Sequence, residues 1–265
     1  MIIAIIVFLG ALVWLLIETK WLTIRLPIYA AKPVVVFPNM RKIFRMIGFS
    51  NMWKVFRMLG IHGVLALAGI IGPLILVTMD LIGAFTALGY SPVRQTMSSL
   101  ALTSKGWMAT IGFMLMGLMI ESFTAVLYLN IKRRRGFGFG TALLTFFGFG
   151  MLLVGTFKTK AVGAPSTFSS YVHTVAADSV LGLFPIALAL VLPSIRNDQR
   201  WRKMFNYTVI TCAIALLMVV CYPFLPKNFR FWGLYERIMV LNAITWLATF
   251  AGRLLILSFR FRKTR

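Results

Sequence analysis

Residues 61–84 read IHGVLALAGIIGPLILVTMDLIGA, a run in which Asp80 is the sole charged residue. As a helix rising about 1.5 Å per residue, such a run crosses the roughly 30 Å hydrocarbon core of a bilayer. The composition agrees, because 60% of the 265 residues are hydrophobic and 13% are charged, against about 45–50% and 25% in soluble domains. The sequence therefore predicts a polytopic membrane protein and excludes a soluble globule or a disordered chain.

Comparable apolar runs recur along the chain and predict an all-α bundle of seven spans, at 1–17, 61–84, 106–129, 138–157, 173–193, 206–225 and 235–257. We expect four parts: an N-terminal anchor (1–17), a basic cytoplasmic segment (18–60), a six-helix core (61–258) and a basic tail (259–265). The first run is interpreted as an uncleaved anchor, because no basic residue precedes it and no clear small-residue cleavage site follows.

Basic residues account for the formal net charge of +22. Most of them lie in the segments 18–60, 132–135, 196–203 and 260–265, which fall on the same side of a seven-span bundle. Because Lys and Arg collect on the cytoplasmic side, we expect the N-terminus outside and the C-terminus in the cytoplasm. No nucleic-acid partner is expected, since no reading module accompanies the charge.

A 12-residue repeat lies in the basic segment, as NMRKIFRMIG (39–48) and NMWKVFRMLG (51–60). We expect two short interfacial helices, ended by Gly48 and Gly60. Their basic residues would contact anionic lipid or a partner's acidic surface: Arg41, Lys42, Arg45, Lys54 and Arg57. A local duplication that packs under the bundle is the alternative.

Polar residues near the outer ends of the spans and in the loop after span two form a candidate ligand-binding cluster. Its members are Asp80, Tyr90, Arg94, Gln95, Ser98, His173, Asp178, Glu236, Arg237 and Asn242. Two interpretations stay open: a pocket for a headgroup or small polar ligand, or a self-contained hydrogen-bond network that pins the loop to the bundle.

Two further ionisable residues, Glu121 and Arg253, fall in the inner halves of their spans, and we expect them to form an ion pair. The alternative is that Arg253 reaches the headgroups and Glu121 is protonated. Gly136 and Gly140 form a GxxxG pattern that favours close helix packing.

Cofactor candidates are few. His62 and His173 lie about a membrane thickness apart and could each be a single axial ligand of a tetrapyrrole, but no metal cluster or cofactor is predicted. Bound lipid is expected. Cys212 and Cys221, about 13 Å apart along one helix, cannot bridge each other.

The stretch GYSPVRQTMSSLA (89–101) resembles the signature of a bacterial and archaeal membrane family known as domain of unknown function 998. His173, the GLYERI motif (233–238) and Trp246 also fit that family. The resemblance implies a six-helix core over about residues 61–258 and a prokaryotic plasma membrane. The family usually has an acidic residue after its third core span, where this chain has FKTK (157–160).

For function we expect a non-enzymatic integral subunit or interaction protein of a larger membrane assembly, whose partners are membrane lipids and other subunits. A carrier or lipid-handling protein that uses the outer polar pocket is the alternative. An intramembrane enzyme is a further alternative, because Ser98, His173 and Asp80 or Asp178 supply the residue types of an acyl-transfer triad.

Overall fold

The computed structural model describes the backbone of residues 50–226 and 228–263, and side chains from residue 61 to residue 258 apart from Lys227. Within these ranges the chain is helical and has no strand. The long helices are α3 (Ser50–Thr86), α5 (Gly106–Asn130), α6 (Phe137–Thr156), α7 (Phe168–Asn197), α8 (Phe205–Cys221) and α9 (Trp232–Lys263). Three short elements connect them: α4 (Met97–Leu100), η1 (Arg202–Met204) and η2 (Tyr222–Phe224).

Within the described residues, six stretches are long and apolar enough to cross a membrane, and the chain is an integral membrane protein. They are Ile61–Thr86, Gly106–Asn130, Phe137–Thr156, Phe168–Asn197, Arg202–Phe224 and Trp232–Ser258. These stretches confirm the last six predicted spans. The predicted first span, 1–17, lies outside the described residues.

The helix α7 starts at Phe168, five residues before the predicted start of the span at residue 173. The helix begins before residue 173 because the Thr167 side chain accepts a hydrogen bond from the Ser170 N–H. In return, Ser170 Oγ accepts one from the Thr167 N–H, which completes a capping box. This local signal fixes the helix start ahead of the apolar run.

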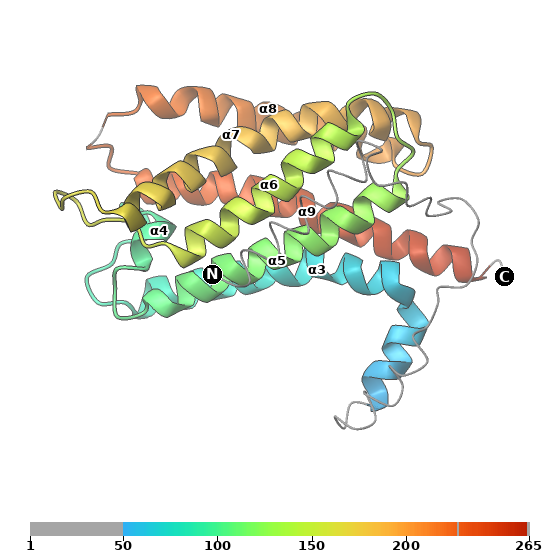
Figure 1. The fold of residues 1–265 in the computed structure, drawn as a ribbon, viewed down its shortest axis with the longest axis horizontal. Coiled ribbons are helices and arrows are strands. Elements are labelled where there is room, and N and C mark those ends of the chain that lie inside the picture. Colours follow the sequence, from blue (N-terminus) through green and yellow to red (C-terminus); the bar gives the residue numbers. More distant parts are fainter. Residues whose placement is uncertain (1–49, 227, 264–265) are drawn as a thin grey trace.

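The basic segment and the first core span share one helix, because α3 starts at Ser50 and runs through Gly60 without a break. The expectation that Gly60 ends a separate interfacial helix is therefore wrong. A single helical glycine costs about 1 kcal/mol, and the long apolar run that follows Gly60 keeps the helix going. Figure 1 shows the first turns of α3, which hold Lys54 and Arg57, projecting away from the bundle.

The rest of the prediction of two interfacial helices concerns the first repeat copy and cannot be compared with the fold. The first repeat copy, with Arg41, Lys42, Arg45 and Gly48, lies outside the described residues.

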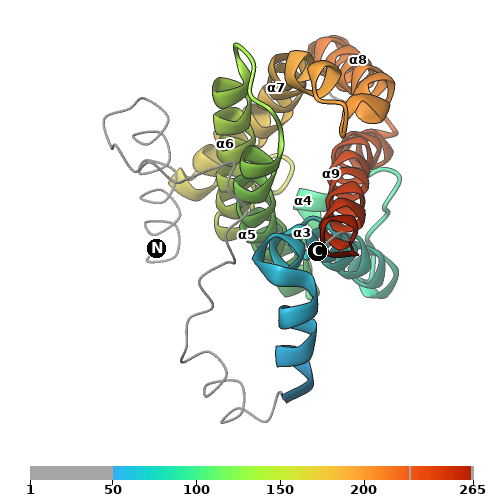
Figure 2. The same ribbon diagram turned by 90° about the vertical axis from the view of Figure 1, so that its right-hand side faces the viewer.

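The helices form a ring in the order α3, α5, α6, α7, α8, α9, in which each helix packs against the next and α9 returns to α3 (Figure 2). Loops 87–105 and 157–167 and the segments 225–226 and 228–231 lie at one end of the bundle, which we call the signature-loop end (Figure 1). The connections 131–136 and 198–201 lie at the other, which we call the Asp198 end. The strongly basic connections among the described residues thus share the Asp198 end.

Close packing of α6 on α7 depends on Gly140. A Cβ there would lie 2.9 Å from Leu190 Cβ and 3.0 Å from the Ala187 carbonyl oxygen, closer than side chains tolerate. The GxxxG pattern therefore does what small residues do between membrane helices, which is to let backbones approach.

Candidate functional site

The signature loop, residues 89–101, folds back on itself through its own side chains. Tyr90 Oη donates to the Thr96 carbonyl at 2.8 Å, and Gln95 Oε1 accepts from the Ser91 N–H at 2.6 Å. Thr96 also begins the short helix α4 by accepting a hydrogen bond from the Ser99 N–H. The loop is therefore a compact unit with a defined shape.

The first turn of α9 lies directly against this unit. The Leu234 N–H donates to the Val93 carbonyl at 3.1 Å. A Cβ on Gly233 would lie 2.2 Å from the Gln95 carbonyl oxygen and 2.4 Å from that of Pro92, so a side chain has no room there. Glycine at the start of GLYERI therefore permits backbone contact between two motifs that are far apart in the sequence.

Arg237 ties three parts of the chain together. Its Nε and Nη2 donate to Asp80 Oδ2 and Oδ1, each at 2.9 Å, in a two-pronged ion pair. Nη2 also reaches Tyr90 Oη at 2.8 Å, and Nη1 reaches the Pro92 carbonyl at 2.6 Å. Further contacts join Nη1 to the carbonyls of Gln95 and Gly233. The guanidinium thus joins α3, α9 and the signature loop.

Glu236, the residue before Arg237, holds the other side of the loop. Its Oε2 accepts from the Met97 N–H, and its Oε1 accepts from Ser98 Oγ at 3.2 Å. The carboxylate therefore satisfies an N–H at the start of α4 that the short helix itself leaves unpaired.

The Tyr90 hydroxyl is buried within this cluster, and burial raises its pKa above the usual value of tyrosine, although the Arg237 hydrogen bond lowers it in part. The phenol therefore keeps its proton. It needs that proton to donate to the Thr96 and Gln95 carbonyls while it accepts from Arg237.

The structure thus gathers six of the predicted cluster residues: Asp80, Tyr90, Gln95, Ser98, Glu236 and Arg237. Their polar groups bond one another and the loop backbone. This arrangement favours the interpretation of a self-contained network that pins the loop to the bundle.

Four predicted members lie elsewhere. Arg94 is exposed on the loop surface. His173 is buried, and its Nδ1 contacts the Phe157 carbonyl at 2.7 Å. Asn242 donates to the Thr211 carbonyl of α8 at 3.0 Å. Asp178 is exposed on α7, in a position described below. Since Ser98 and His173 bond different partners, the structure does not bring them together as a catalytic pair.

A second polar cluster, centred on Asp198, was missed by the sequence analysis. Asp198 is 5% exposed, and its carboxylate accepts bonds from the Lys132 N–H at 3.0 Å and from Arg200 Nη2 at 2.8 Å. Arg200 Nη2 and Trp201 Nε1 both reach the Asn130 carbonyl. These bonds join the α5–α6 and α7–α8 connections. The available signal was a lone acid within a strongly basic segment.

Burial tends to raise the pKa of Asp198, but hydrogen bonds from Arg200 and from the Lys132 N–H outweigh it. The net pKa lies below that of an ordinary aspartate. The carboxylate is therefore charged at neutral pH, as its positive partner requires.

The predicted ion pair between Glu121 and Arg253 is wrong. Arg253 directs Nε and Nη2 to the Arg200 carbonyl, at 3.2 and 2.7 Å, and so belongs to the Asp198 cluster. Glu121 lies instead at the contact of α5 with α6, where its Oε1 is 2.8 Å from the position of a Cβ on Gly148. That oxygen is buried without a hydrogen-bond partner among the described residues. Both residues lie in the halves of their helices nearer the Asp198 end, but they face different neighbours.

The histidines have side-chain or backbone partners at opposite ends of the bundle, since His62 Nδ1 contacts Asn130 Nδ2 at 3.2 Å. Among the residues searched, no three His, Cys, Asp or Glu side chains come together as a possible metal site.

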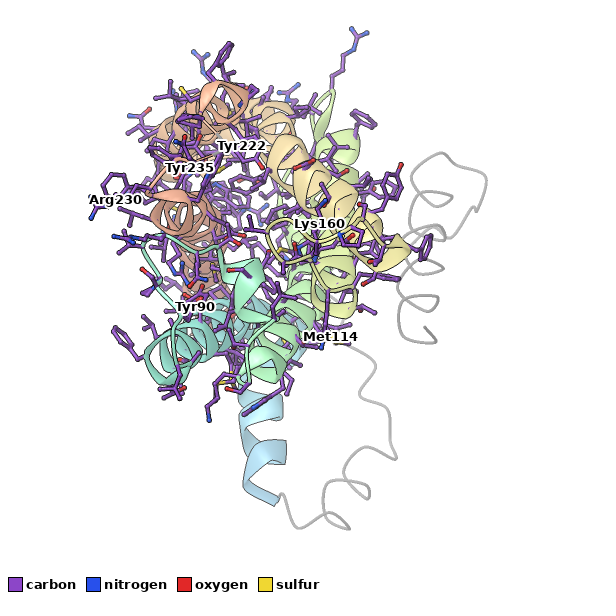
Figure 3. All side chains as sticks on the ribbon, turned by 90° about the vertical axis from the view of Figure 1, so that its left-hand side faces the viewer. Tyr90, Met114, Lys160, Tyr222, Arg230 and Tyr235 are labelled. Atoms are coloured by element: carbon purple, nitrogen blue, oxygen red, sulfur yellow. The ribbon has the colours of Figure 1, made fainter. Side chains whose placement is uncertain are left out.

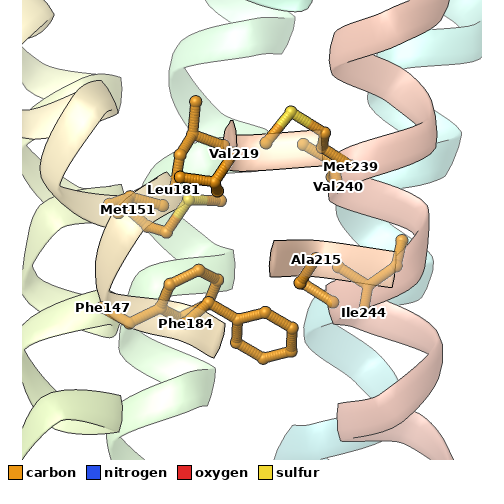
Figure 4. Close-up of a pocket in the computed structure, with 11 residues that line it drawn as sticks. Phe147, Met151, Leu181, Phe184, Ala215, Val219, Met239, Val240 and Ile244 are labelled. Carbon is orange, nitrogen blue, oxygen red and sulfur yellow. The ribbon is translucent and has the colours of Figure 1, made fainter. Parts of the chain in front are cut away.

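An apolar pocket lies inside the ring of helices, between α6, α7, α8 and α9 (Figure 4). About 430 Å³ of space free of atoms lies between its walls, a figure that includes space open to the outside. Its walls are entirely nonpolar in residue type: Phe147, Met151, Val180, Leu181, Phe184, Ala215, Val219, Met239, Val240, Ala243 and Ile244. Figure 4 shows Phe184 and Ile244 facing each other across the pocket.

An aromatic cluster lies one helical turn from this pocket, toward the signature-loop end. Tyr222 packs on Trp232 with ring centroids 5.4 Å apart, and Trp232 packs on Tyr235 at 6.1 Å. Figure 3, which faces this end, shows Tyr222 and Tyr235 together and separate from Tyr90. Asp178 lies close enough to Tyr222 for its charge to act on the phenol. Tyr and Trp are enriched at membrane–water interfaces.

The sequence model of a family described as "Protein of unknown function (DUF998)" matches residues 70–253. The match covers more than half of the chain, and the chain therefore belongs to this family. The resemblance drawn from the signature loop is confirmed. No curated protein and no solved structure matches the chain.

Proposed function

We propose that this member of the DUF998 family is a non-enzymatic lipid-binding membrane protein, which holds one hydrocarbon chain in the pocket between α6, α7, α8 and α9. The observation that supports this function is the pocket itself. Its uniformly apolar wall suits a chain and disfavours a polar substrate, because polar groups left without partners are costly to bury.

The surroundings of the pocket support a lipid as its occupant. Lipid chains are the apolar molecules that a bundle of membrane-spanning helices meets in bulk. The span that contains α8 is the least buried of the six. In its most apolar stretch 17% of the residues are buried, against 39–72% in the corresponding stretches of the other five spans. Since α8 also packs less on α9 than on α7, we propose that a chain enters sideways between α8 and α9.

The polar cluster at the signature loop supports this function indirectly. Its internal bonds fix the start of α9 on α3, and Met239 and Val240 of α9 form one wall of the pocket. We therefore propose that the cluster positions the pocket wall and does not itself bind a ligand.

We further propose that the Asp198 end faces the cytoplasm and contacts anionic lipid there. The exposed residues Lys132, Arg134 and Arg135 lie at that end, beside Arg196 and Arg202. Basic residues near an anionic leaflet contribute about 1 kcal/mol each. In this orientation the end of the pocket nearest Asp178 faces the outer leaflet of a prokaryotic plasma membrane.

A second candidate function is that of a subunit in a larger membrane assembly. The exposed face of α8 favours it, because Ile210, Ile214, Leu217 and Val220 point away from the bundle. Purification from native membranes distinguishes the two functions. A stoichiometric partner that is lost when Leu217 is replaced by Trp would support the subunit, and a chain that purifies alone would not.

The lipid-binding proposal is tested by filling the pocket. Ala215 is 6% exposed and lines the pocket, whereas Ala213 on the same helix faces outward. We expect native mass spectrometry to find one retained lipid on the wild type and on the Ala213→Phe variant, and none on Ala215→Phe. Equal lipid retention by all three proteins would refute the pocket as a binding site.

A further inference from the structure

Asp178 is an ionisable residue in a span helix that the fold does not use. Its carboxylate is exposed on α7 and forms no hydrogen bond or ion pair with any described residue. By contrast, Asp80, Asp198 and Glu236 are each held by two or more bonds. Ionisable groups in spans are expensive and usually functional. An unpartnered one therefore calls for an occupant.

The position of Asp178 relates it to the pocket. It lies one helical turn before Leu181, which lines the pocket, and residues three apart share a helix face. Just after α8, Tyr222 opens η2 one turn beyond the lining residue Val219, and it lies within electrostatic range of Asp178. On α9, Tyr235 precedes the lining residue Met239 by one turn. Each of these three residues lies one turn from a lining residue on the side of the signature-loop end, and we call them the rim of the pocket.

The rim and the pocket have the polarity of one lipid molecule. The apolar pocket lies deeper in the bundle, and the rim lies at the level of the aromatic cluster, whose Tyr and Trp are residue types enriched at membrane–water interfaces. A molecule with its chain in the pocket would have its headgroup beside the Asp178 carboxylate and the Tyr222 phenol.

We propose that the lipid held by this protein carries an ammonium headgroup, which Asp178 binds as its counter-ion at the rim. This inference rests on the proposed lipid-binding function and specifies its ligand. Charge complementarity carries it, because a carboxylate with no cation among the described side chains attracts a cation and repels an anionic head. The ammonium could belong to an ethanolamine phospholipid or to a single-chain amine, which share this chemistry.

The full-length protein in nanodiscs of a neutral galactolipid, which carries no ammonium group, provides the test. Three spin-labelled C16 chains serve as probes, ending in an ammonium, a hydroxyl or a carboxylate group. The fraction of each probe that is immobilised is measured by electron paramagnetic resonance. The difference in immobilised fraction between the wild type and the Ala215→Phe variant measures binding in the pocket. Probe immobilised around the outside of the bundle is present in both proteins and cancels.

We expect the wild-type pocket to prefer the ammonium probe over the hydroxyl probe by about threefold to fivefold, the size of a partly exposed ion pair. The carboxylate probe should bind weakest. Asp178→Asn should remove the ammonium preference and leave the hydroxyl probe unchanged, whereas the neighbouring exposed variant Ser179→Asn should keep it. The thermal stability of Asp178→Asn should equal that of the wild type, since no described residue bonds this side chain.

The outcomes separate the two proposals. Equal pocket binding of all three probes, or an ammonium preference that survives Asp178→Asn, would overturn the headgroup assignment and leave the pocket intact. No pocket-dependent immobilisation of any probe would overturn the lipid-binding function itself. Displacement of the ammonium probe by added phosphatidylethanolamine, but not by phosphatidylglycerol, would identify the phospholipid as the source of the ammonium group.

Discussion

Arg237 of α9 holds Asp80 of α3 through two parallel hydrogen bonds of 2.9 Å, from Nε to Oδ2 and from Nη2 to Oδ1. The two side chains are 14% and 9% exposed. Arg237 uses its remaining donor capacity on carbonyls of the signature loop and of its own helix. One guanidinium thus fixes the relative positions of the first and last described spans and of the loop between α3 and α5.

We expect Arg237→Met to destabilise the fold strongly. Removing one partner of a buried ion pair costs about 3–5 kcal/mol, because the other charge is left unpaired. Arg237→Lys should rescue little of this loss, since an ammonium cannot reproduce the planar fork. Thermal unfolding in detergent measures the effect, and Arg94→Met, on the exposed face of the same loop, is the control. A Tm for Arg237→Met within a degree of that control would contradict the assigned role.

Gly233→Ala should displace the signature loop from α9. Its Cβ would lie 2.2 Å from the Gln95 carbonyl oxygen, and overpacking of this kind costs about 1–3 kcal/mol. The matched control is Gly252→Ala in the same helix, where a Cβ meets nothing within 4 Å. We expect a lower Tm and faster labelling of a cysteine at Ser98 in the first variant alone. Identical labelling rates in both variants would show that the contact is dispensable.

The Asp198 cluster predicts acid sensitivity. Because its folded pKa is lowered, Asp198 contributes stability above its unfolded pKa, about 3.9, and loses it as pH falls through the folded value. Asp198→Asn should therefore lower the Tm at pH 7, by the equivalent of about 1–3 kcal/mol. The difference between wild type and variant should shrink below about pH 4. A difference that stays constant from pH 7 to pH 3 would rule out this linkage.

Glu121 and Arg253 should behave independently, because they contact different neighbours. We expect the unfolding effects of Glu121→Gln and Arg253→Gln to add within about 0.5 kcal/mol in the double variant. Arg253→Gln should be the more damaging change, since it removes two bonds to the Arg200 carbonyl. An interaction energy above about 1 kcal/mol between the two substitutions would instead support the predicted ion pair.

Topology can be checked with single cysteines in a variant that lacks Cys212 and Cys221. Ser104 and Arg135 are both exposed and lie at opposite ends of the bundle. An impermeant maleimide added to intact cells should modify a cysteine at Ser104 and spare one at Arg135, as the basic Asp198 end predicts. The reverse pattern would invert the proposed orientation.

The spans were predictable because the thickness of the bilayer sets the length of apolar sequence that a spanning helix needs, and that length can be read from the local sequence. The six core spans were found within a few residues, and the error at α7 came from a capping box outside the apolar run. Gly60 was misjudged because a glycine ends a helix only where the chain after it can turn, and here an apolar run continues.

The site was only partly predictable because side-chain partners depend on helix rotation. The position of each residue along its span predicted that Asp80 and Arg237 lie at the same end of the bundle, and the two side chains do form an ion pair. The same reasoning also placed Glu121 and Arg253 at the same end, yet they face different neighbours. The apolar pocket had no sequence signal at all, because its lining residues look like any other core residues until the ring of helices is assembled.

The central claim is that the space between α6, α7, α8 and α9 holds a lipid chain. The most direct measurement is an experimental structure of the full-length protein in nanodiscs made from native lipid. We predict continuous chain density between Phe184, Ala215 and Ile244, rising to a headgroup beside Asp178. A pocket closed by contact of Phe184 with Ile244, or an open pocket without chain density, would contradict the claim.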